Sequence, residues 1–296
     1  MIDCDYIKSF FTKIVLGGDK ADLFIKIAES PERFTGLLRP SKPYSKVLQF
    51  LLQSHEIKFG NALEHVIEYM FKSVGFSVET NKKYRFQSEE LSVDLILIKE
   101  NSYYIVEMKV RDDHDSSKKR GQMENLKKKV EAFIKHEKVI PYCILYFVDS
   151  TFRKNRNYYI QELESFRQLY NTETFLFYGE EIFKHFGCGE VWESFMKCLK
   201  EWKEGLPDIP LINYDDNPQE SAEILSKIPL YYWDKIVKND ELWEKGGVIN
   251  SIFKNGETFS ILIDVFKKDE RGPLHKAYKI LSEKLEKRVK NLYKEV

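Results

Sequence analysis

The sequence predicts an α/β domain with a central mixed β-sheet flanked by helices, joined to a region that is mainly helical. Three observations predict this class. Apolar residues repeat at helical spacing through residues 59–71, short apolar strands follow, and amphipathic helices then alternate with the later strands. The resulting order of helix, strands, helix, strand, helix and strand is typical of an α/β domain.

The first part of the chain is expected to be helical. Residues 1–57 contain short apolar repeats at helical spacing, and the clearer repeat that follows predicts a helix that stops near Gly75. Glu64 lies at the border of the apolar stripe of this helix, where a carboxylate reaches either solvent or a neighbouring cleft. Two short strands are expected next, at residues 76–80 and 84–86.

Residues 91–111 are predicted to form a hairpin of two apolar strands with a turn at residues 100–102, and both strands carry charge. Asp94 interrupts the first strand, and Glu107 and Lys109 interrupt the second. Because side chains alternate between the faces of a strand, Glu107 and Lys109 point to the same side, about 7 Å apart along the backbone. Burial of these charges costs free energy unless they have partners or a task, so this hairpin is where we expect chemistry.

After the hairpin the sequence becomes polar and then strongly basic. Asp112, Asp113 and Asp115 are predicted to lie in a solvated loop. Residues 116–130 hold six basic side chains against one acidic side chain, on a helix with an apolar face of its own. The lysines at 127–129 belong either to a DNA-binding surface or only to the solvated face of this helix.

The later elements complete the predicted sheet. An apolar run at residues 142–148 predicts an inner strand that is covered on both faces. A basic segment at residues 152–158 follows, and then a helix at 161–169 and a further strand at 174–178. We place the end of the domain near Gly189.

The remainder of the chain is mainly helical in pattern, with one strand pair around residues 246–266. It contains all four tryptophans, which in such a region are more often part of the core or of a subunit interface than platforms for nucleic-acid bases. The sequence therefore divides into an N-terminal helical region at 1–57, a core domain at 58–189, and a C-terminal region at 190–296 that would serve DNA recognition or dimerisation.

Composition limits the classes of function. Lys plus Arg and Asp plus Glu number 47 each, so the formal net charge is zero and any contact with nucleic acid must rest on local clusters. The four cysteines form no CxxC pair and have no histidine at zinc-finger spacing, so we expect neither a disulfide nor structural zinc, and we expect a reducing cytoplasm. No apolar stretch approaches the roughly 18–20 residues of a membrane span.

Asp94, Glu107 and Lys109 together place two carboxylates and an amine on neighbouring strands. Hydrolysis of a phosphodiester needs a divalent metal ion to neutralise developing charge and to activate water. Mg²⁺ is usually held by one or two carboxylates, with water and substrate phosphate as the other ligands, and Asp94 and Glu107 fit that role. Lys109 would orient the attacking water, assist its deprotonation or stabilise the transition state. The alternative is a surface hairpin with a salt bridge.

The spacing of Asp94, twelve intervening residues, Glu107, one residue and Lys109 resembles the PD-(D/E)XK nuclease superfamily, and within it the type II restriction endonucleases. The resemblance covers roughly residues 58–189. It implies that Asp94 and Glu107 bind Mg²⁺, that Lys109 is catalytic, and that Glu64 of the preceding helix is a further metal ligand.

Two basic segments are predicted to contact DNA. In the family that this sequence resembles, a helix after the motif brings a glutamine or basic side chains near the scissile phosphate. A loop after an inner strand could read base edges, because Arg and Asn side chains match guanine and adenine. The residues concerned are Lys118, Lys119, Arg120 and Gln122 in the first segment, and Arg153, Lys154, Arg156 and Asn157 in the second. One departure from the family pattern is Val93, which stands where the motif has proline.

The resemblance implies a type II restriction endonuclease that makes Mg²⁺-dependent, sequence-specific cuts in double-stranded DNA. A homodimer is the simplest arrangement, because one catalytic set per chain cuts one strand and two-fold symmetry matches a palindromic site. The alternatives are a nuclease of the same fold that acts on junctions or damaged DNA in repair or recombination, and a non-catalytic DNA-binding module on that fold.

Overall fold

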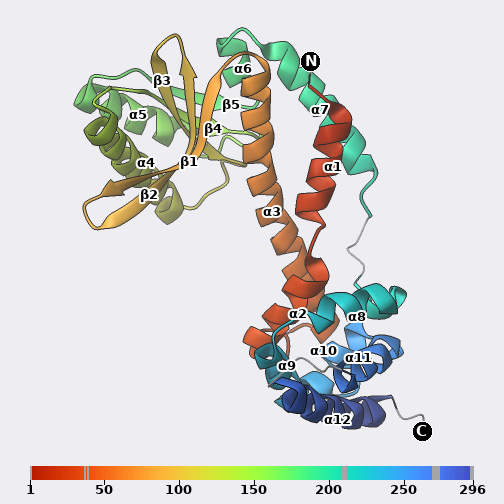
Figure 1. Cartoon of the computed structure of the whole chain (residues 1–296). Coiled ribbons are helices and arrows are strands. Elements are labelled where there is room, and N and C mark those ends of the chain that lie inside the picture. Colours follow the sequence, from red (N-terminus) through yellow and green to blue (C-terminus); the bar gives the residue numbers. More distant parts are fainter. Residues whose placement is uncertain (1, 37, 39, 208–211, 269–273, 294–296) are drawn as a thin grey trace. The chain divides into compact units, whose positions relative to one another are not determined.

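A computed structural model describes residues 2–36, 38, 40–207, 212–268 and 274–293 of the chain (Figure 1). The chain forms two compact units, and each unit is assembled from two separate stretches of sequence. Unit 1 comprises Met1–Ile14 and Ile57–Leu206, and unit 2 comprises Val15–Glu56 and Pro207–Val296. The grouping differs from the predicted consecutive segments 1–57, 58–189 and 190–296, because stretches from both sides of the predicted core domain pack with it.

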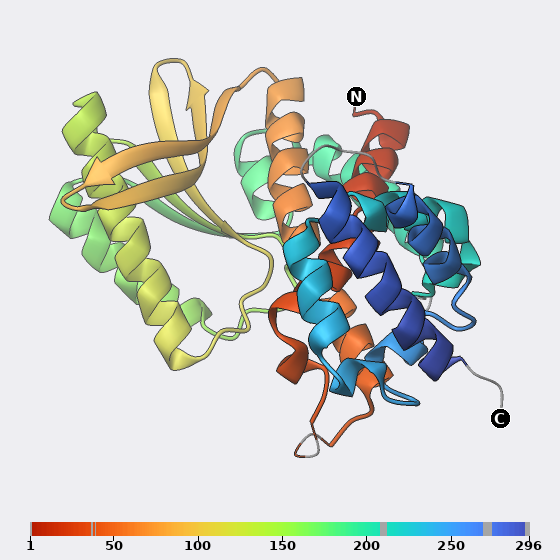
Figure 2. The same ribbon diagram turned by 60° about the horizontal axis from the view of Figure 1, so that its bottom comes forward.

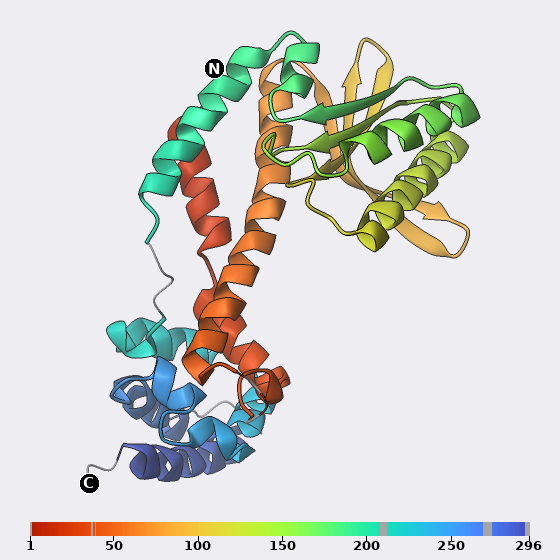
Figure 3. The ribbon, with the colours of Figure 1, turned by 180° about the vertical axis from the view of Figure 1, so that it is seen from behind.

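Unit 1 is built around a five-stranded mixed sheet with the strand order β1-β2-β3-β4-β5. β1, β2 and β3 are antiparallel neighbours, whereas β3, β4 and β5 run parallel (Figure 1, Figure 3). The five strands span Ser77–Phe86, Glu89–Lys99, Ser102–Lys109, Tyr142–Phe147 and Thr174–Tyr178. The predicted α/β class with a mixed sheet is confirmed, although β1 is continuous where two short strands were expected.

The hairpin between β2 and β3 turns at Glu100 and Asn101, whose φ angles are 50° and 64°. Lys99 pairs with Ser102 across the turn. Positive φ at both central residues is a feature of the type I′ turn, whose twist matches that of the flanking antiparallel strands. The turn lies where the sequence predicts it, and it fixes the register of the two charged strands.

Helices cover both faces of the sheet. α4 (Ser116–Glu137) connects β3 to β4, α5 (Arg156–Tyr170) connects β4 to β5, and both pack apolar side chains on one face. On the other face, Tyr104 of β3 packs against Phe186 at the end of α6 (Glu181–His185), with ring centroids 5.1 Å apart. α3 (Pro43–Ser73) packs on α6 there, because its Phe71 stacks on Phe183 with ring centroids 4.9 Å apart (Figure 1). The sheet is therefore covered on both faces, as expected of its apolar inner strands.

Two helices from distant parts of the sequence are joined in unit 1. A disulfide links Cys4 of α1 (Cys4–Val15) to Cys198 of α7 (Gly189–Glu204), with the Cα atoms 5.2 Å apart. This distance lies in the usual range for disulfides. The prediction that no disulfide forms is wrong for this pair, because cysteines 194 residues apart become neighbours only through the packing of the helices.

Unit 2 contains helices and no strand among its described residues (Figure 2). Its core gathers apolar side chains from α2, the first part of α3, and α8 to α12. The bounds are α2 Asp19–Glu29, η1 Pro31–Arg33, η2 Tyr214–Asp216, α8 Pro218–Ser226, α9 Leu230–Lys238, η3 Glu241–Trp243, α10 Val248–Ile252, α11 Glu257–Lys267 and α12 His275–Leu292. Trp233 and Trp243 are buried in this core, as the sequence predicts.

The strand pair expected around residues 246–266 is instead helical, in α10 and α11. The buried apolar side chains of α11 recur at steps of three and four residues, which is the spacing of one helix face. They are Phe259, Leu262, Ile263 and Phe266. Asp215 further stabilises the start of α11, because its Oδ1 accepts a hydrogen bond from the backbone N–H of Thr258 at 2.9 Å.

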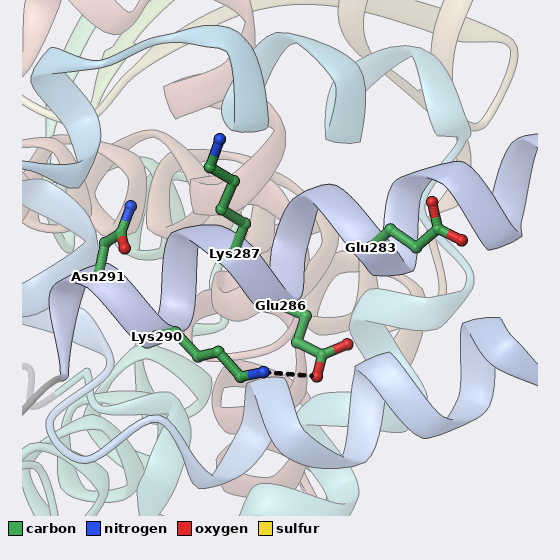
Figure 4. A pocket seen from close by; sticks show the side chains of 5 residues that line it. All are labelled: Glu283, Glu286, Lys287, Lys290 and Asn291. Atoms are coloured by element: carbon green, nitrogen blue, oxygen red, sulfur yellow. Dashed lines mark ion pairs between the residues drawn. The ribbon is translucent and has the colours of Figure 1, made fainter.

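An open hollow of about 350 Å³ lies on α12 (Figure 4). It is lined by Glu283, Glu286, Lys287, Lys290 and Asn291, and Lys290 pairs with Glu286 at 3.1 Å. Side chains of both charges line it, so it offers a ligand neither an apolar surface nor a single sign of charge. Over the residues that the structure describes, no helix has both the length and the apolar character that crossing a membrane requires.

Candidate active site

The predicted acidic pair lies where β2 and β3 part. The antiparallel pairing of these strands ends at Leu95 and Val106, and Asp94 and Glu107 lie just beyond this last pair. Here the backbone N–H of Met108 donates a hydrogen bond to Asp94 Oδ2 at 3.1 Å. This bond ties the Asp94 carboxylate to β3 and places it beside Glu107.

Lys109 contacts both carboxylates. Its Nζ lies 2.8 Å from Glu107 Oε1 and 3.3 Å from Asp94 Oδ2. The same ammonium group donates a hydrogen bond to the carbonyl oxygen of Met108 at 2.7 Å. The prediction that Glu107 and Lys109 share one side of their strand is confirmed by this contact.

Lys129 of α4 is a second lysine at the same place. Its Nζ lies 2.6 Å from Glu107 Oε2 and 2.9 Å from Asp94 Oδ1, and the residue is only 4% exposed. The alternative that residues 127–129 form a solvated face is wrong for Lys129. The sequence did contain the signal, because Lys129 lies three residues after Leu126 and four before Phe133, on the apolar stripe of the helix.

The charges of these groups support one another. Burial disfavours the charged form of Asp94, but Lys109, Lys129 and the Met108 N–H outweigh burial and hold the pKa of Asp94 below its ordinary value. Burial likewise disfavours the charged form of Lys109, and the carboxylates of Glu107 and Asp94 outweigh it and raise the pKa of Lys109. Asp94 is therefore a carboxylate, and Lys109 an ammonium group, at neutral pH.

Glu64 lies on α3, one helical turn after Gly60. A Cβ built on Gly60 would lie 3.6 Å from Val110 Cγ2, so this part of α3 approaches the end of β3 closely. Burial raises the pKa of Glu64, and the negative charge of Asp94 raises it further. The negative charge of the acidic pair therefore acts on Glu64. This favours the prediction that its carboxylate reaches a neighbouring cleft over the prediction that it reaches solvent.

The donor set fits a hard divalent cation. Asp94 and Glu107 offer carboxylate oxygens in one small volume, and oxygen is the ligand that Mg²⁺ prefers. In the part of the chain that the structure describes, no group of three or more His, Cys, Asp or Glu side chains is arranged to hold a metal ion. The metal role of Asp94 and Glu107, and of Glu64 as a third ligand, therefore stays a prediction.

The aspartates that follow β3 differ in their surroundings. Asp113 and Asp115 are exposed, and Asp115 is the N-cap residue of α4. Asp112 is fully buried, and its carboxylate accepts hydrogen bonds at 2.9 Å from the backbone N–H and Nδ2 of Asn155 and from the Tyr178 hydroxyl. The predicted solvated loop is wrong for Asp112, because its partners come from a loop and a strand far along the chain.

The predicted DNA contacts after β3 lie at the start of α4. Lys118 and Arg120 are exposed and Lys119 is half-buried. Gln122 is half-buried, and its Oε1 accepts a hydrogen bond from the Tyr159 hydroxyl at 2.7 Å. Lys118 and Arg120 are therefore open to solvent, whereas Lys119 and Gln122 are partly covered.

The predicted DNA contacts after β4 are all exposed; they are Arg153, Lys154, Arg156 and Asn157. Arg153 pairs with Glu181 at 2.9 Å, and a backbone bridge joins it to Asp112. The loops after β3 and β4 are therefore tied together. Because these strands are parallel, both basic segments follow the same edge of the sheet, where β3 ends with Lys109.

A mixed sheet covered by helices, with an Asp, Glu and Lys set on its antiparallel hairpin, is consistent with a restriction-endonuclease-like fold. Residues 77–203 match the family model described as "Type II restriction endonuclease, HinfI". The matched segment contains Asp94, Glu107 and Lys109, and it confirms the predicted resemblance to type II restriction endonucleases.

Other comparisons add little. No curated protein matches the chain. Among solved structures, Can2 from Sulfobacillus thermosulfidooxidans in complex with cyclic tetra-adenylate is similar, with a TM-score of 0.31 and 8% sequence identity. The match covers 66% of this chain and 52% of that protein. A likeness at this TM-score supports no conclusion about function.

Proposed function

We propose that this chain is a type II restriction endonuclease that hydrolyses phosphodiester bonds in both strands of DNA at a defined sequence, with Mg²⁺ as its cofactor. One observation carries the proposal. Asp94 and Glu107 are held side by side, each in contact with Lys109, within a segment that matches a restriction endonuclease family. A salt-bridged surface hairpin does not account for Glu107, which is only 2% exposed.

The residues of the hairpin divide the chemical work. When bound, Mg²⁺ supplies positive charge that neutralises the developing charge on the phosphate and activates a water molecule. Asp94 and Glu107 would hold the ion, with Glu64 as a further ligand. The Lys109 side chain keeps 31% of its surface exposed, so its ammonium group can donate a hydrogen bond to the attacking water or to a phosphate oxygen.

Double-stranded DNA would lie along the edge of the sheet where β3 and β4 end. Basic side chains in the first turns of α4 and in the segment that leads from β4 into α5 would neutralise phosphates there. Arg156 and Asn157, at the start of α5, are candidates for reading base edges. Gln122, which is half-buried, would contact DNA from the first of these segments. We further propose that two copies act as a homodimer, because one catalytic set cuts one strand.

Digestion of a fully sequenced plasmid with Mg²⁺, followed by mapping of the fragment ends, tests the proposal. The expected result is a set of ends at one defined sequence on both strands. Asp94→Asn and Lys109→Ala are expected to reduce the cleavage rate by at least about 10²-fold while DNA binding is retained. Asp113→Asn, a substitution at an exposed position in the next loop, is the control and should cut like the wild type.

Other outcomes would favour other functions. Random cutting of the plasmid contradicts a restriction enzyme. Cutting of branched or damaged DNA alone would indicate a repair or recombination nuclease of the same fold. A wild-type protein that binds DNA without cutting any substrate would indicate a non-catalytic module.

A further inference from the structure

A buried ammonium group lies among the proposed metal ligands and takes no part in the reaction as proposed. Lys129 Nζ contacts Asp94 Oδ1 at 2.9 Å and Glu107 Oε2 at 2.6 Å. Lys109 contacts the other oxygen of each carboxylate. Each carboxylate is therefore shared by two lysines, one on each of its oxygens.

The two lysines differ in their access to solvent. The side chain of Lys109 is 31% exposed, whereas that of Lys129 is 5% exposed and comes from the helix that covers the sheet. A cation from solution would therefore reach the carboxylates from the side of Lys109. Lys109 can turn toward water or phosphate when such an ion enters, and Lys129 remains on its two oxygens.

We propose that Lys129 is a permanent cation of this site and supplies the charge that a second metal ion supplies in two-metal nucleases, so that each chain binds one divalent ion. The inference rests on the proposed function. Two-metal sites hold their ions about 3.5–4 Å apart and share carboxylates between them. Here Lys129 already occupies one oxygen of each carboxylate that a second ion would need.

The balance of charge favours a single ion. The carboxylates of Asp94 and Glu107 and the ammonium groups of Lys109 and Lys129 cancel formally. The charges of one divalent ion, an ionised Glu64 and one substrate phosphate also sum to zero. A second divalent ion would leave an excess charge of two beside buried groups, where screening by water is weak.

Counting of bound Mn²⁺ by electron paramagnetic resonance tests this role without DNA. The wild type is expected to bind one Mn²⁺ per chain, with no coupling between neighbouring ions. Lys129→Met shortens the side chain by one atom, keeps it unbranched and removes its charge, so it is expected to bind Mn²⁺ at least about tenfold more tightly and to take a second, coupled ion. Lys128→Met is the matched control, because Lys128 lies on the same helix but pairs with Glu89 near the surface, and it should behave as the wild type.

Two results would overturn the role of Lys129. One is a wild type with two coupled Mn²⁺ ions per chain, which is decisive even where Lys129→Met fails to fold. The other is a folded Lys129→Met with the ion count and affinity of the wild type. Plasmid digestion with the same preparation separates the two proposals. Cutting with two coupled ions leaves the nuclease proposal standing, whereas a wild type that neither binds Mn²⁺ nor cuts DNA overturns the nuclease proposal itself.

Discussion

Replacement of Asp112 by alanine is expected to destabilise unit 1 strongly. The Asp112 carboxylate is fully buried and accepts hydrogen bonds from two groups of Asn155 and from the Tyr178 hydroxyl. In Asp112→Ala the side-chain amide of Asn155 keeps its hydrogen bond to the carbonyl oxygen of His114, which is 3.0 Å long. The Asn155 backbone N–H and the Tyr178 hydroxyl lose their acceptor. A buried donor without an acceptor costs about 1–3 kcal/mol, so the two together predict a loss of about 2–6 kcal/mol in the free energy of unfolding.

Hydrogen exchange in peptides from β4 and β5, followed at increasing urea, measures the free energy of unfolding for unit 1 separately from unit 2. The two neighbouring aspartates are matched controls. Asp113→Ala, at an exposed position, is expected to change the free energy by no more than about 0.5 kcal/mol. Asp115→Ala removes the N-cap of α4 and should speed exchange mainly at the start of that helix. A loss in Asp112→Ala as small as that in Asp113→Ala would refute the reasoning, because the two aspartates differ mainly in their buried hydrogen bonds.

Three further predictions concern stability. Reduction of the Cys4–Cys198 disulfide is expected to lower the free energy of unfolding by about 2–5 kcal/mol, because the bond constrains a long loop of the unfolded chain. Urea unfolding with and without reductant measures this loss. Cys188→Ser is the control, because Cys188 is a free cysteine. A urea midpoint that reductant leaves unchanged would show that the Cys4–Cys198 bond does not form in solution. Glu64→Gln is expected to raise the thermal midpoint at pH 7. Burial and nearby carboxylates raise the pKa of Glu64, so the native state binds the proton more tightly and stability falls as pH rises from the ordinary value of 4.5 through the raised pKa. Glu68→Gln is expected to lower the midpoint, because ion pairs with a lysine and a histidine on the same helix outweigh burial and lower the pKa of Glu68. The stabilisation from these ion pairs is present above pH 4.5 and is lost as pH falls through the lowered pKa of Glu68. Melting curves across pH check both signs, and shifts in the same direction would contradict the assignment.

The sequence predicts the parts of the site that are set by local rules. The turn at Glu100 and Asn101 joins two apolar strands, so the hairpin that carries Asp94, Glu107 and Lys109 follows from the local sequence. The contact of Lys109 with Glu107 is a consequence of the period of two residues in a strand.

Features that depend on tertiary packing could not be predicted in this way. Lys129 lies on the apolar stripe of its helix, but a lysine within a basic run is normally predicted to be exposed. Its burial follows only from the carboxylates of Asp94 and Glu107, which the sequence does not place beside it. Asp112 likewise depends on Asn155 and Tyr178, which lie 43 and 66 residues further along the chain. Pairings over such distances leave no periodic signal in the sequence.

The division of each unit into two stretches of sequence also sets an order of assembly during protein synthesis. All of unit 1 has been made once residue 206 emerges from the ribosome, whereas the residues 15–56 of unit 2 still lack their partner helices. In the folded protein the ring centroid of Phe24 lies 4.5 Å from that of Trp233. Phe24 would stay exposed until the later helices of unit 2 have been made. At the usual rates of translation this interval lasts roughly 5–20 s. The nascent chain would therefore carry a folded unit 1 and an exposed apolar segment together, and that segment is where a chaperone would bind.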